Sequence, residues 1–231
     1  MRGSGVNALM TLIRSPMMGQ ADRVVRYADV SFNTELTVIN KLSAVAKNTG
    51  HRHGIVLMVE LGDLREGIMP ADVEGVMRKA LQLPNIKIIG VGANLACRSG
   101  VVPDAKNMAE LSLLTNALEA TFDLKLATVS GGNSANLLWA IGSKMPGRIN
   151  DLRLGESILL GCEPLHRKPV PGLHTNAITL VAEVIESKLK PSQPTGTLAQ
   201  TAFGEQPVNA DKGNVVPVSY THLTLPTILL V

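Results

Sequence analysis

The chain has 231 residues, of which 45% are hydrophobic and 18% are charged, so it can bury a sizeable core and is not intrinsically disordered. Its formal net charge of +3 comes from Lys and Arg residues that are scattered along the chain. With only one Trp, two Tyr and three Phe available to stack on bases, the composition argues against a nucleic acid as partner.

Cysteine usage and the lack of long apolar segments indicate where the protein works. Cys97 and Cys162 do not have the spacing of a metal site, and two isolated thiols are typical of a reducing compartment. No segment has the length and apolar character of a membrane span, and the first residues lack a signal-peptide pattern. We therefore expect a cytoplasmic protein without a metal site and without a membrane partner.

Short apolar runs alternate with amphipathic stretches over the first part of the chain. We expect strands at residues 10–13, 30–32, 55–61, 86–91, 126–130 and 151–154. Helical patterns lie at residues 33–47, where Asn33 can act as the N-cap, and at residues 71–81, 104–122 and 135–140. This alternation predicts an α/β fold with a parallel sheet and right-handed crossovers. Six β/α units are two fewer than a closed (β/α)8 TIM barrel contains, so residues 1–162 are interpreted as a partial barrel.

The pattern changes after residue 162. Three prolines between residues 163 and 172 predict a linker over residues 163–175. β character at residues 176–186 and turn-like residues at 188–194 then predict the start of a β-rich C-terminal domain over residues 176–216. Residues 217–227 resemble translated transposase-adaptor DNA from sequencing libraries. We therefore interpret residues 217–231 as a non-native tail and leave them out of the fold prediction.

Two motifs follow the last two expected strands. Ser130-Gly-Gly-Asn-Ser134 ends an apolar run and opens a helical stretch, and Arg153-Leu-Gly-Glu156 comes about one crossover later. Glycines allow backbone N–H groups to approach an anion, serine hydroxyls add donors, and a helix start adds positive potential. Loops after the last two strands of an α/β barrel are a common phosphate site. The motifs predict either a phosphorylated cofactor with an arginine beside it or an ordinary strand-to-helix turn.

Two further motifs, Glu60-Leu-Gly-Asp-Leu-Arg-Glu-Gly67 and Gly92-Ala-Asn-Leu-Ala-Cys97, come earlier in the chain. From about residue 10 to about residue 208, the four motifs together resemble the pyridoxal-phosphate amino-acid racemases of the alanine racemase fold, and in particular the ornithine racemase-like subgroup. The resemblance implies a cofactor-binding (β/α)8 barrel followed by a C-terminal β-domain. It also implies a homodimer that uses pyridoxal 5'-phosphate to interconvert the L- and D-forms of an amino acid. Ornithine, alanine, serine and lysine all fit the motifs.

The resemblance places the cofactor at the ends of the later strands. It implies that Asn94 lies beside the ring and that Ser134 binds the phosphate together with neighbouring backbone groups. The cofactor-binding residues that it implies are Asn94, Ser130, Asn133, Ser134, Arg153, Gly155 and Glu156. Cys97 either faces the site or is a small buried residue. Ser31 and Asn33 end another strand and can line the pocket.

Two arginines are the catalytic residues that the resemblance implies. Arg153 donates to the pyridine nitrogen of the cofactor; because a guanidinium keeps its proton, the nitrogen stays unprotonated, which favours racemisation over transamination. Arg65 approaches the phenolic oxygen of the cofactor or the carboxylate of the substrate, and both acceptors suit a two-pronged donor. The residues alone also allow surface ion pairs, of Arg153 with Asp151 or Glu156 and of Arg65 with Asp63 or Glu66.

The resemblance further implies a lysine on the first barrel strand that binds the cofactor covalently. The lysines of this chain precede strands, lie on helices or fall in the linker and the β-domain, so none has that position. We therefore expect the six units to match the third to eighth barrel strands, and the chain to be an incomplete, inactive piece of the enzyme. Two other functions stay open. One is a non-catalytic pyridoxal-phosphate-binding protein for cofactor homeostasis, and the other is a lyase or epimerase barrel for a phosphorylated substrate.

Overall fold

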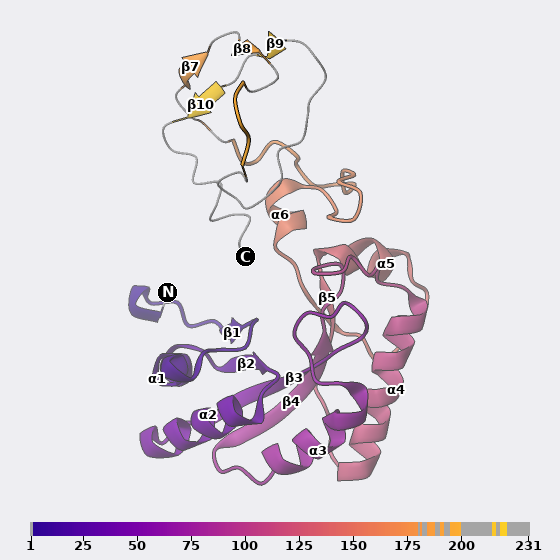
Figure 1. Ribbon diagram of the computed structural model, residues 1–231. Helices are drawn as coiled ribbons and strands as arrows, with labels where there is room; N and C mark the ends of the chain where they lie inside the picture. The colour runs from indigo at the N-terminus through magenta and orange to yellow at the C-terminus, as the bar shows by residue number, and fades with distance from the viewer. Residues whose placement is uncertain are drawn as a thin grey trace. The chain divides into compact units, whose positions relative to one another are not determined.

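The computed structural model describes residues 2–179, 181, 184–187, 190–191, 195–199, 214–215 and 218–220. The chain divides into two units, Met1–Ile178 and Thr179–Val231, and each is described by itself (Figure 1). Every residue that the sequence analysis assigned to the cofactor site belongs to the first unit. Within the described residues, no helix is long and apolar enough to cross a membrane.

The first unit is built on a parallel sheet whose strand order follows the chain, β1-β2-β3-β4-β5-β6. Its strands are β1 (Thr11–Leu12), β2 (Val30–Asn33), β3 (His53–Val59), β4 (Ile86–Ala93), β5 (Thr128–Asn133) and β6 (Asp151–Arg153). Each lies on one of the six expected runs, which confirms the predicted α/β fold. The sheet curls into part of a barrel, and β1 and β6 are its edges (Figure 1).

Helices alternate with these strands, and the first four of them cover the outer side of the sheet (Figure 1). They are α1 (Ala21–Tyr27), α2 (Leu36–Thr49), α3 (Pro70–Ala80), α4 (Ala105–Phe122), α5 (Leu137–Gly142) and α6 (Glu156–Leu160), with the 3-10 turns η1 (Arg2–Ser4), η2 (Met18–Gln20) and η3 (Ser134–Asn136). The expected helices α2, α3 and α4 are confirmed. The sequence analysis missed α1 and α6, because 7 and 5 residues are too few to show a helical period.

Asn33 does not cap α2, so that part of the prediction was wrong. Strand β2 extends through Asn33, and Glu35 takes the N-cap position without a side-chain hydrogen bond. The side chain of Asn33 is buried, and its Nδ2 atom donates to the carbonyl oxygen and to the hydroxyl of Ser31, both at 2.9 Å. The amide therefore bonds locally, within its own strand, instead of reaching the first turn of the helix.

Both faces of the sheet are apolar, as expected of parallel strands that are covered on two sides. The core on the helix side includes Ile39, Leu42, Ile55, Leu57 and Leu111, each 0% exposed. A smaller cluster on the inner face of the curl contains Val30, Phe32, Val56 and Met58. Because successive side chains of a strand point to opposite faces, Phe32 faces the inside of the curl while Ser31 faces the helices.

The expected linker at residues 163–175 contains a compact turn built on a buried carboxylate. Glu163 is only 2% exposed. Its carboxylate accepts hydrogen bonds from the backbone N–H groups of Leu165 at 2.7 Å, His166 at 3.0 Å and Lys168 at 3.0 Å. A carboxylate can replace the missing backbone acceptors of an irregular segment in this way. The proline-rich segment is therefore held in one conformation next to α6.

In the second unit the structure describes short antiparallel pairs. Strand β7 (Val184–Ser187) pairs with β10 (Val218–Tyr220), and β8 (Lys190–Pro191) pairs with β9 (Asn214–Val215). The expected β segment at 176–186 overlaps β7, whereas β8 falls in the expected turn at 188–194, of which the other residues lie outside the described ones. β10 lies in the segment 217–231 that we interpreted as a non-native tail, and the remaining residues of that segment also lie outside the described ones.

Candidate functional site

The two motifs at the ends of β5 and β6 meet at one cavity. The carboxyl ends of parallel strands share one edge of a sheet, so loops that follow neighbouring strands are brought together there. The cavity has a volume of about 420 Å³ and is lined by Ile13, Ala96, Cys97, Asn133, Ser134, Arg153, Leu154, Gly155, Glu156 and Pro164. Five of the seven residues expected to bind the cofactor, all from the two motifs, are therefore in its wall.

Ser134 is the centre of a cluster of hydrogen-bond donors in this wall. It is the first residue of η3, directly after β5, and it is only 3% exposed. Its Oγ atom accepts from the backbone N–H of Gly155 at 3.2 Å and from the backbone N–H and the hydroxyl of Ser157, both at 3.1 Å. Backbone N–H groups and hydroxyls that converge in this manner suit an anion. The sequence analysis missed Ser157, although it directly follows the Arg153-to-Glu156 motif.

Glycine is required in the turn that places Ser134. Gly132 has a φ of +150°, and a Cβ atom there would lie 2.1 Å from Oδ1 of Asn136. The register between β5 and β6 shifts between Ser130 and Asn133, which turns the end of β5. Asn133 then closes the turn, because its Oδ1 atom accepts from the backbone N–H of Ala135 at 2.8 Å. Gly132 is thus explained by a local change of direction of the chain.

Arg153 is held by three acceptors, one on β5, one at the end of β4 and one directly after β4. Its Nη1 atom donates to Oγ of Ser130 at 2.6 Å, and its Nη2 atom donates to the carbonyl oxygen of Ala93 at 2.7 Å and to Oδ1 of Asn94 at 3.2 Å. Burial lowers the pKa of Arg153 to about 10, although the charge of Asp151 acts in the opposite direction. The guanidinium therefore stays protonated at neutral pH, and it is fixed in one orientation at the cavity wall.

Ser130 and Asn94 lie behind Arg153 and do not line the cavity. Ser130 is 0% exposed, and its hydroxyl donates to Oδ2 of Asp151 while it accepts from Arg153. Oδ1 of Asn94 accepts from Arg153 and also from Nδ2 of Asn133 at 3.0 Å. Ser130 and Asn94 thus contact side chains that line the cavity, those of Arg153 and Asn133. The sequence also allowed a surface ion pair of Arg153 with Asp151 or Glu156. In the structure the guanidinium instead donates to Ser130, Ala93 and Asn94.

Arg65 lies on the loop between β3 and α3, at the margin of the cavity. Its side chain is 42% exposed, and its Nε atom pairs with Oε2 of Glu66 at 2.6 Å. Its Nη1 atom donates to Sγ of Cys97, which is itself exposed and lines the cavity. The structure therefore contains the expected Arg65–Glu66 pair and also brings the guanidinium to the cavity through Cys97. Cys97 therefore faces the site, and its interpretation as a small buried residue was wrong.

Ser31 and Asn33 do not reach the cavity. Both lie on the helix side of β2, where Oγ of Ser31 is 2.8 Å from Nε2 of the buried His53. The residues of β2 that face the inside of the curl are Val30 and Phe32, which line a second cavity of about 250 Å³ together with Arg153. The strand period of two residues explains the difference, because it places neighbouring residues on opposite faces.

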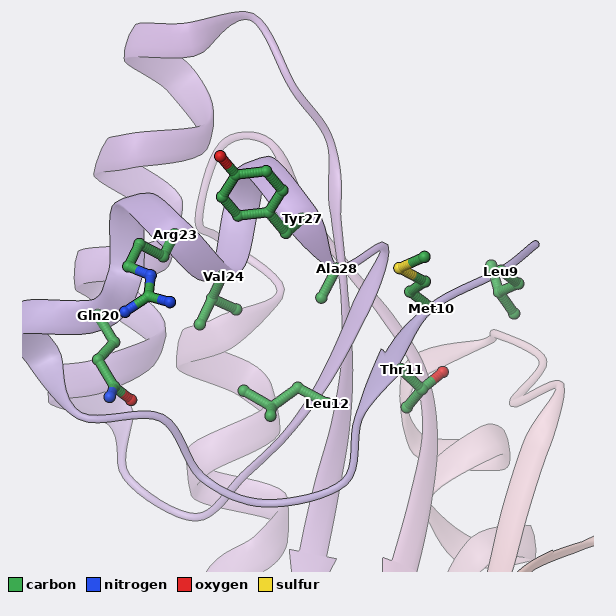
Figure 2. Close-up of a pocket in the computed structure, with 9 residues that line it drawn as sticks. All are labelled: Leu9, Met10, Thr11, Leu12, Gln20, Arg23, Val24, Tyr27 and Ala28. Carbon is green, nitrogen blue, oxygen red and sulfur yellow. The ribbon is translucent and has the colours of Figure 1, made fainter. Parts of the chain in front are cut away.

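A larger cavity lies away from these residues. It has a volume of about 510 Å³ and lies between α1 and the edge strand β1. Figure 2 shows its lining, in which Leu12 and Val24 face the hollow and the polar ends of Gln20 and Arg23 lie at one side. None of the expected site residues is among the lining residues. Its chemistry is mainly apolar, so size alone does not identify the site.

Comparison with known proteins identifies the family. Residues 1–164 match the family described as alanine racemase, N-terminal domain, and the chain belongs to this family. It is 38% identical over 203 residues to an ornithine racemase from Acetoanaerobium sticklandii, covering 87% of this chain and 58% of that protein. It is 30% identical over 213 residues to a lysine racemase from Thermotoga maritima, covering 92% of this chain and 59% of that protein.

Solved structures show a similar fold. An alanine racemase from Clostridium difficile 630 has a TM-score of 0.59 at 15% identity, covering 93% of this chain and 55% of that one. PipY from Synechococcus elongatus PCC7942, solved with PLP bound, has a TM-score of 0.56 at 19% identity, covering 66% of this chain and 71% of that one. Both the predicted racemase-family resemblance and the partial barrel are confirmed. The chain spans 58% and 59% of the length of the two curated relatives.

Proposed function

We propose that this protein, at its full natural length, is a pyridoxal-phosphate-dependent racemase that interconverts the L- and D-forms of an amino acid. The observation that carries the proposal is that the donor cluster around Ser134 and the guanidinium of Arg153 open on one cavity. A phosphate and a pyridine ring belong to the same small molecule, so these two features together match that cofactor better than either does alone. The identity to ornithine and lysine racemases supports a cationic amino acid as substrate.

The residues of the cavity fit the phosphate of this cofactor. The N–H contacts of Gly155 and Ser157 to Oγ of Ser134 measure 3.2 and 3.1 Å, which is at the long end for such bonds. A doubly charged phosphate is a stronger acceptor than a neutral hydroxyl, so it can compete for the same donors. We assign phosphate binding to the hydroxyl of Ser134 and to the backbone of Asn133, Gly155 and Glu156. Their exposure to one cavity supports this assignment.

The role of Arg153 follows from its charge. When bound, pyridoxal phosphate supplies an electron-withdrawing ring that acidifies the α-hydrogen of an amino acid. Arg153 would donate to the ring nitrogen and keep it from taking up a proton, because a guanidinium with a pKa of about 10 does not give up its own proton at neutral pH. Ser130 and Asn94 keep the guanidinium in place. This arrangement limits the lifetime of the deprotonated α-carbon and so favours the return of a proton over transamination.

The loop that carries Arg65 supplies the second catalytic group of the proposal. The guanidinium of Arg65 donates to the thiol of Cys97, which lies in the cavity wall. Only the Cys97 side chain lies between Arg65 and the cavity. From there the guanidinium can meet a substrate carboxylate or the phenolic oxygen of the cofactor.

We further propose that the protein acts as a homodimer in the cytoplasm. The two free thiols, Cys97 and Cys162, support a reducing compartment.

Cofactor binding can be tested on the chain itself. Trp139 is the only tryptophan and lies on α5, which directly follows η3, so its fluorescence reports on the anion site. Titration with pyridoxal 5'-phosphate should quench this fluorescence with a Kd between about 1 µM and 1 mM, because charge-assisted hydrogen bonds hold the phosphate without a covalent bond. The variant Ser134→Ala should bind about tenfold more weakly. Absence of saturable quenching in the native chain contradicts the assigned cofactor.

Racemase activity is tested with the protein at its full natural length. Incubation with L-ornithine, L-lysine and L-alanine, followed by chiral chromatography, should yield the D-form of at least one of them. A protein that binds the cofactor and racemises no amino acid would support the second function, a non-catalytic pyridoxal-phosphate-binding protein. The fold similarity to PipY with PLP bound is the observation that favours this second function. The higher identity to two racemases favours the first.

A further inference from the structure

Asp63 is a fully buried carboxylate between two loops at the cavity margin. It lies on the loop between β3 and α3 and is 0% exposed. Its two oxygens accept from four backbone N–H groups of the loop between β4 and α4: Cys97 at 3.2 Å, Arg98 at 2.7 Å, Ser99 at 3.3 Å and Val101 at 3.2 Å. The carboxylate thus occupies a concave nest of donors, as an anion would.

The charge of Asp63 is stable in this position. Burial raises the pKa of the carboxyl group, but the N–H groups of Arg98, Val101, Cys97 and Ser99 outweigh burial and hold the pKa below its usual value. The group is therefore ionised at neutral pH. Hydrogen bonds to an ionised acceptor are stronger than neutral ones, so this carboxylate ties the two loops firmly together.

Other contacts brace the same pair of loops. The hydroxyl of Ser99 donates to the carbonyl oxygen of Asp63 at 2.8 Å, and Nη1 of Arg98 donates to the carbonyl oxygen of Leu64 at 2.8 Å. Within the first loop, Oε1 of Glu60 accepts from the backbone N–H of Leu64 at 3.0 Å. The loop that carries Arg65 is therefore bonded to its own strand end and to the neighbouring loop.

We propose that Asp63 is a positioning residue of the site, which sets Arg65 at the cavity by locking its loop to the loop that carries Cys97. Arg65 follows Asp63 by two residues, and its guanidinium contacts Cys97, whose own backbone N–H is bonded to Asp63. Both partners of the Arg65–Cys97 contact are thus fixed by one carboxylate. This role rests on the proposed function, since it is Arg65 that would meet the substrate or the cofactor.

Hydrogen exchange of the full chain tests the lock without any cofactor. In Asp63→Asn, the amide hydrogens of residues 97–101 should exchange at least about tenfold faster, because an amide group replaces one acceptor with a donor. Amides of β3 and α4 should keep their native rates. Glu163→Gln is the matched control: it also removes the charge of a buried carboxylate bonded to backbone N–H groups, but it should accelerate exchange only near residues 165–168.

A double-mutant cycle at full natural length tests whether Asp63 acts through Arg65. Asp63→Asn should lower kcat/KM about tenfold in the native background and less than about twofold when Arg65 is already replaced by lysine. Equal losses in the two backgrounds overturn the proposal, and so does unchanged exchange at residues 97–101 or faster exchange throughout the sheet. Should Asp63→Asn not fold, Ser99→Ala removes one bond between the loops and should accelerate the same amides to a smaller extent. Failure of the exchange test leaves the cofactor titration, and with it the proposed function, untouched.

Discussion

The guanidinium of Arg153 lies over the ring of Phe32, with its Cζ atom 4.9 Å from the ring centroid. Phe32 is on β2 and Arg153 is on β6, which are four positions apart in the sheet. In a flat sheet these strands would be about 19 Å apart. The contact therefore exists because the sheet curls, and it crosses the inside of the partial barrel. The ring of Phe32 supports the guanidinium from across the inside of the curl. The curvature of the sheet therefore helps to orient the arginine.

Replacing Phe32 with leucine should loosen Arg153. The change removes a cation–π contact and part of a buried ring, and should lower the free energy of unfolding by about 1–2 kcal/mol in urea denaturation. Because Arg153 loses one of its supports, cofactor binding measured by Trp139 quenching should weaken about threefold. Phe122→Leu is the matched control, since the ring of Phe122 lies 5.0 Å from Cζ of Arg78, away from the site. If both variants bind the cofactor equally well, Phe32 has no part in placing Arg153.

Replacing Arg153 with glutamate should change the outcome of the reaction in the protein at full natural length. A carboxyl group beside the ring nitrogen can give it a proton, which strengthens the electron-withdrawing effect of the ring and favours transamination. The ratio of keto acid to D-amino acid formed from one L-amino acid should rise at least about tenfold. Arg78→Glu makes the same charge change on an exposed helix position and should leave the ratio as it is. An unchanged ratio in Arg153→Glu would contradict the role of this arginine.

The strands and the two cavity motifs could be predicted from sequence because their signals are local. A parallel strand that is buried on both sides has a continuous apolar run, as residues 55–59 of β3 do, and needs no partner to be recognised. The motif from Ser130 to Ser134 carries its turn in its glycines. Its two serines nevertheless diverge, since Ser130 supports Arg153 and Ser134 meets Gly155. The register shift that separates them depends on β6, which a local pattern does not contain.

Contacts between distant loops could not be predicted in the same way. Asp63 bonds to residues that are 34 to 38 positions further along the chain, and no periodicity links the two segments. From sequence, Asp63 was only a neighbour with which Arg65 could pair. Similarly, Asn33 has the residue type of a helix cap, but whether it caps depends on where β2 ends. Both residues show that the type of a polar residue indicates its chemistry, whereas its partners follow from the tertiary fold.

The buried His53 should make stability depend on pH. Burial lowers its pKa from 6.5 to about 4, although the carbonyl of Ala28 and the charge of Asp29 act in the opposite direction. Below pH 6.5 the unfolded chain therefore binds a proton that the folded protein does not, and stability falls as the pH decreases towards 4. Urea denaturation should give about 2 kcal/mol less stability at pH 5 than at pH 7. His53→Gln should remove most of this difference, and His51→Gln, at an exposed position, should keep it. A native-like pH dependence in His53→Gln would mean that another group carries it.

A further buried carboxylate, that of Glu119, allows a direct comparison of two ion pairs in one protein. Glu119 is 7% exposed and accepts from Nη1 and Nη2 of Arg148 at 3.0 and 2.8 Å and from the backbone N–H of Leu126 at 2.8 Å. These bonds, those of Arg148 first, lower its pKa to about 2. On α3, by contrast, Glu74 pairs with Arg78 at 2.6 Å, and the two side chains are 54% and 57% exposed.

Glu119→Gln should lower the free energy of unfolding by about 2–4 kcal/mol at pH 7, because it leaves the charge of Arg148 without its partner in a partly buried position. Glu74→Gln should change it by no more than about 0.5 kcal/mol, since water already screens that pair. The folded-state pKa of Glu119 is depressed, so its contribution is fully present above pH 4.5 and is lost as the pH falls towards 2. Urea denaturation of both variants at pH 7 and pH 3 measures these terms. The difference in the free energy of unfolding between the native protein and Glu119→Gln should be smaller at pH 3 than at pH 7. An equal difference at both pH values would show that the packing of Glu119, and not its charge, stabilises the protein.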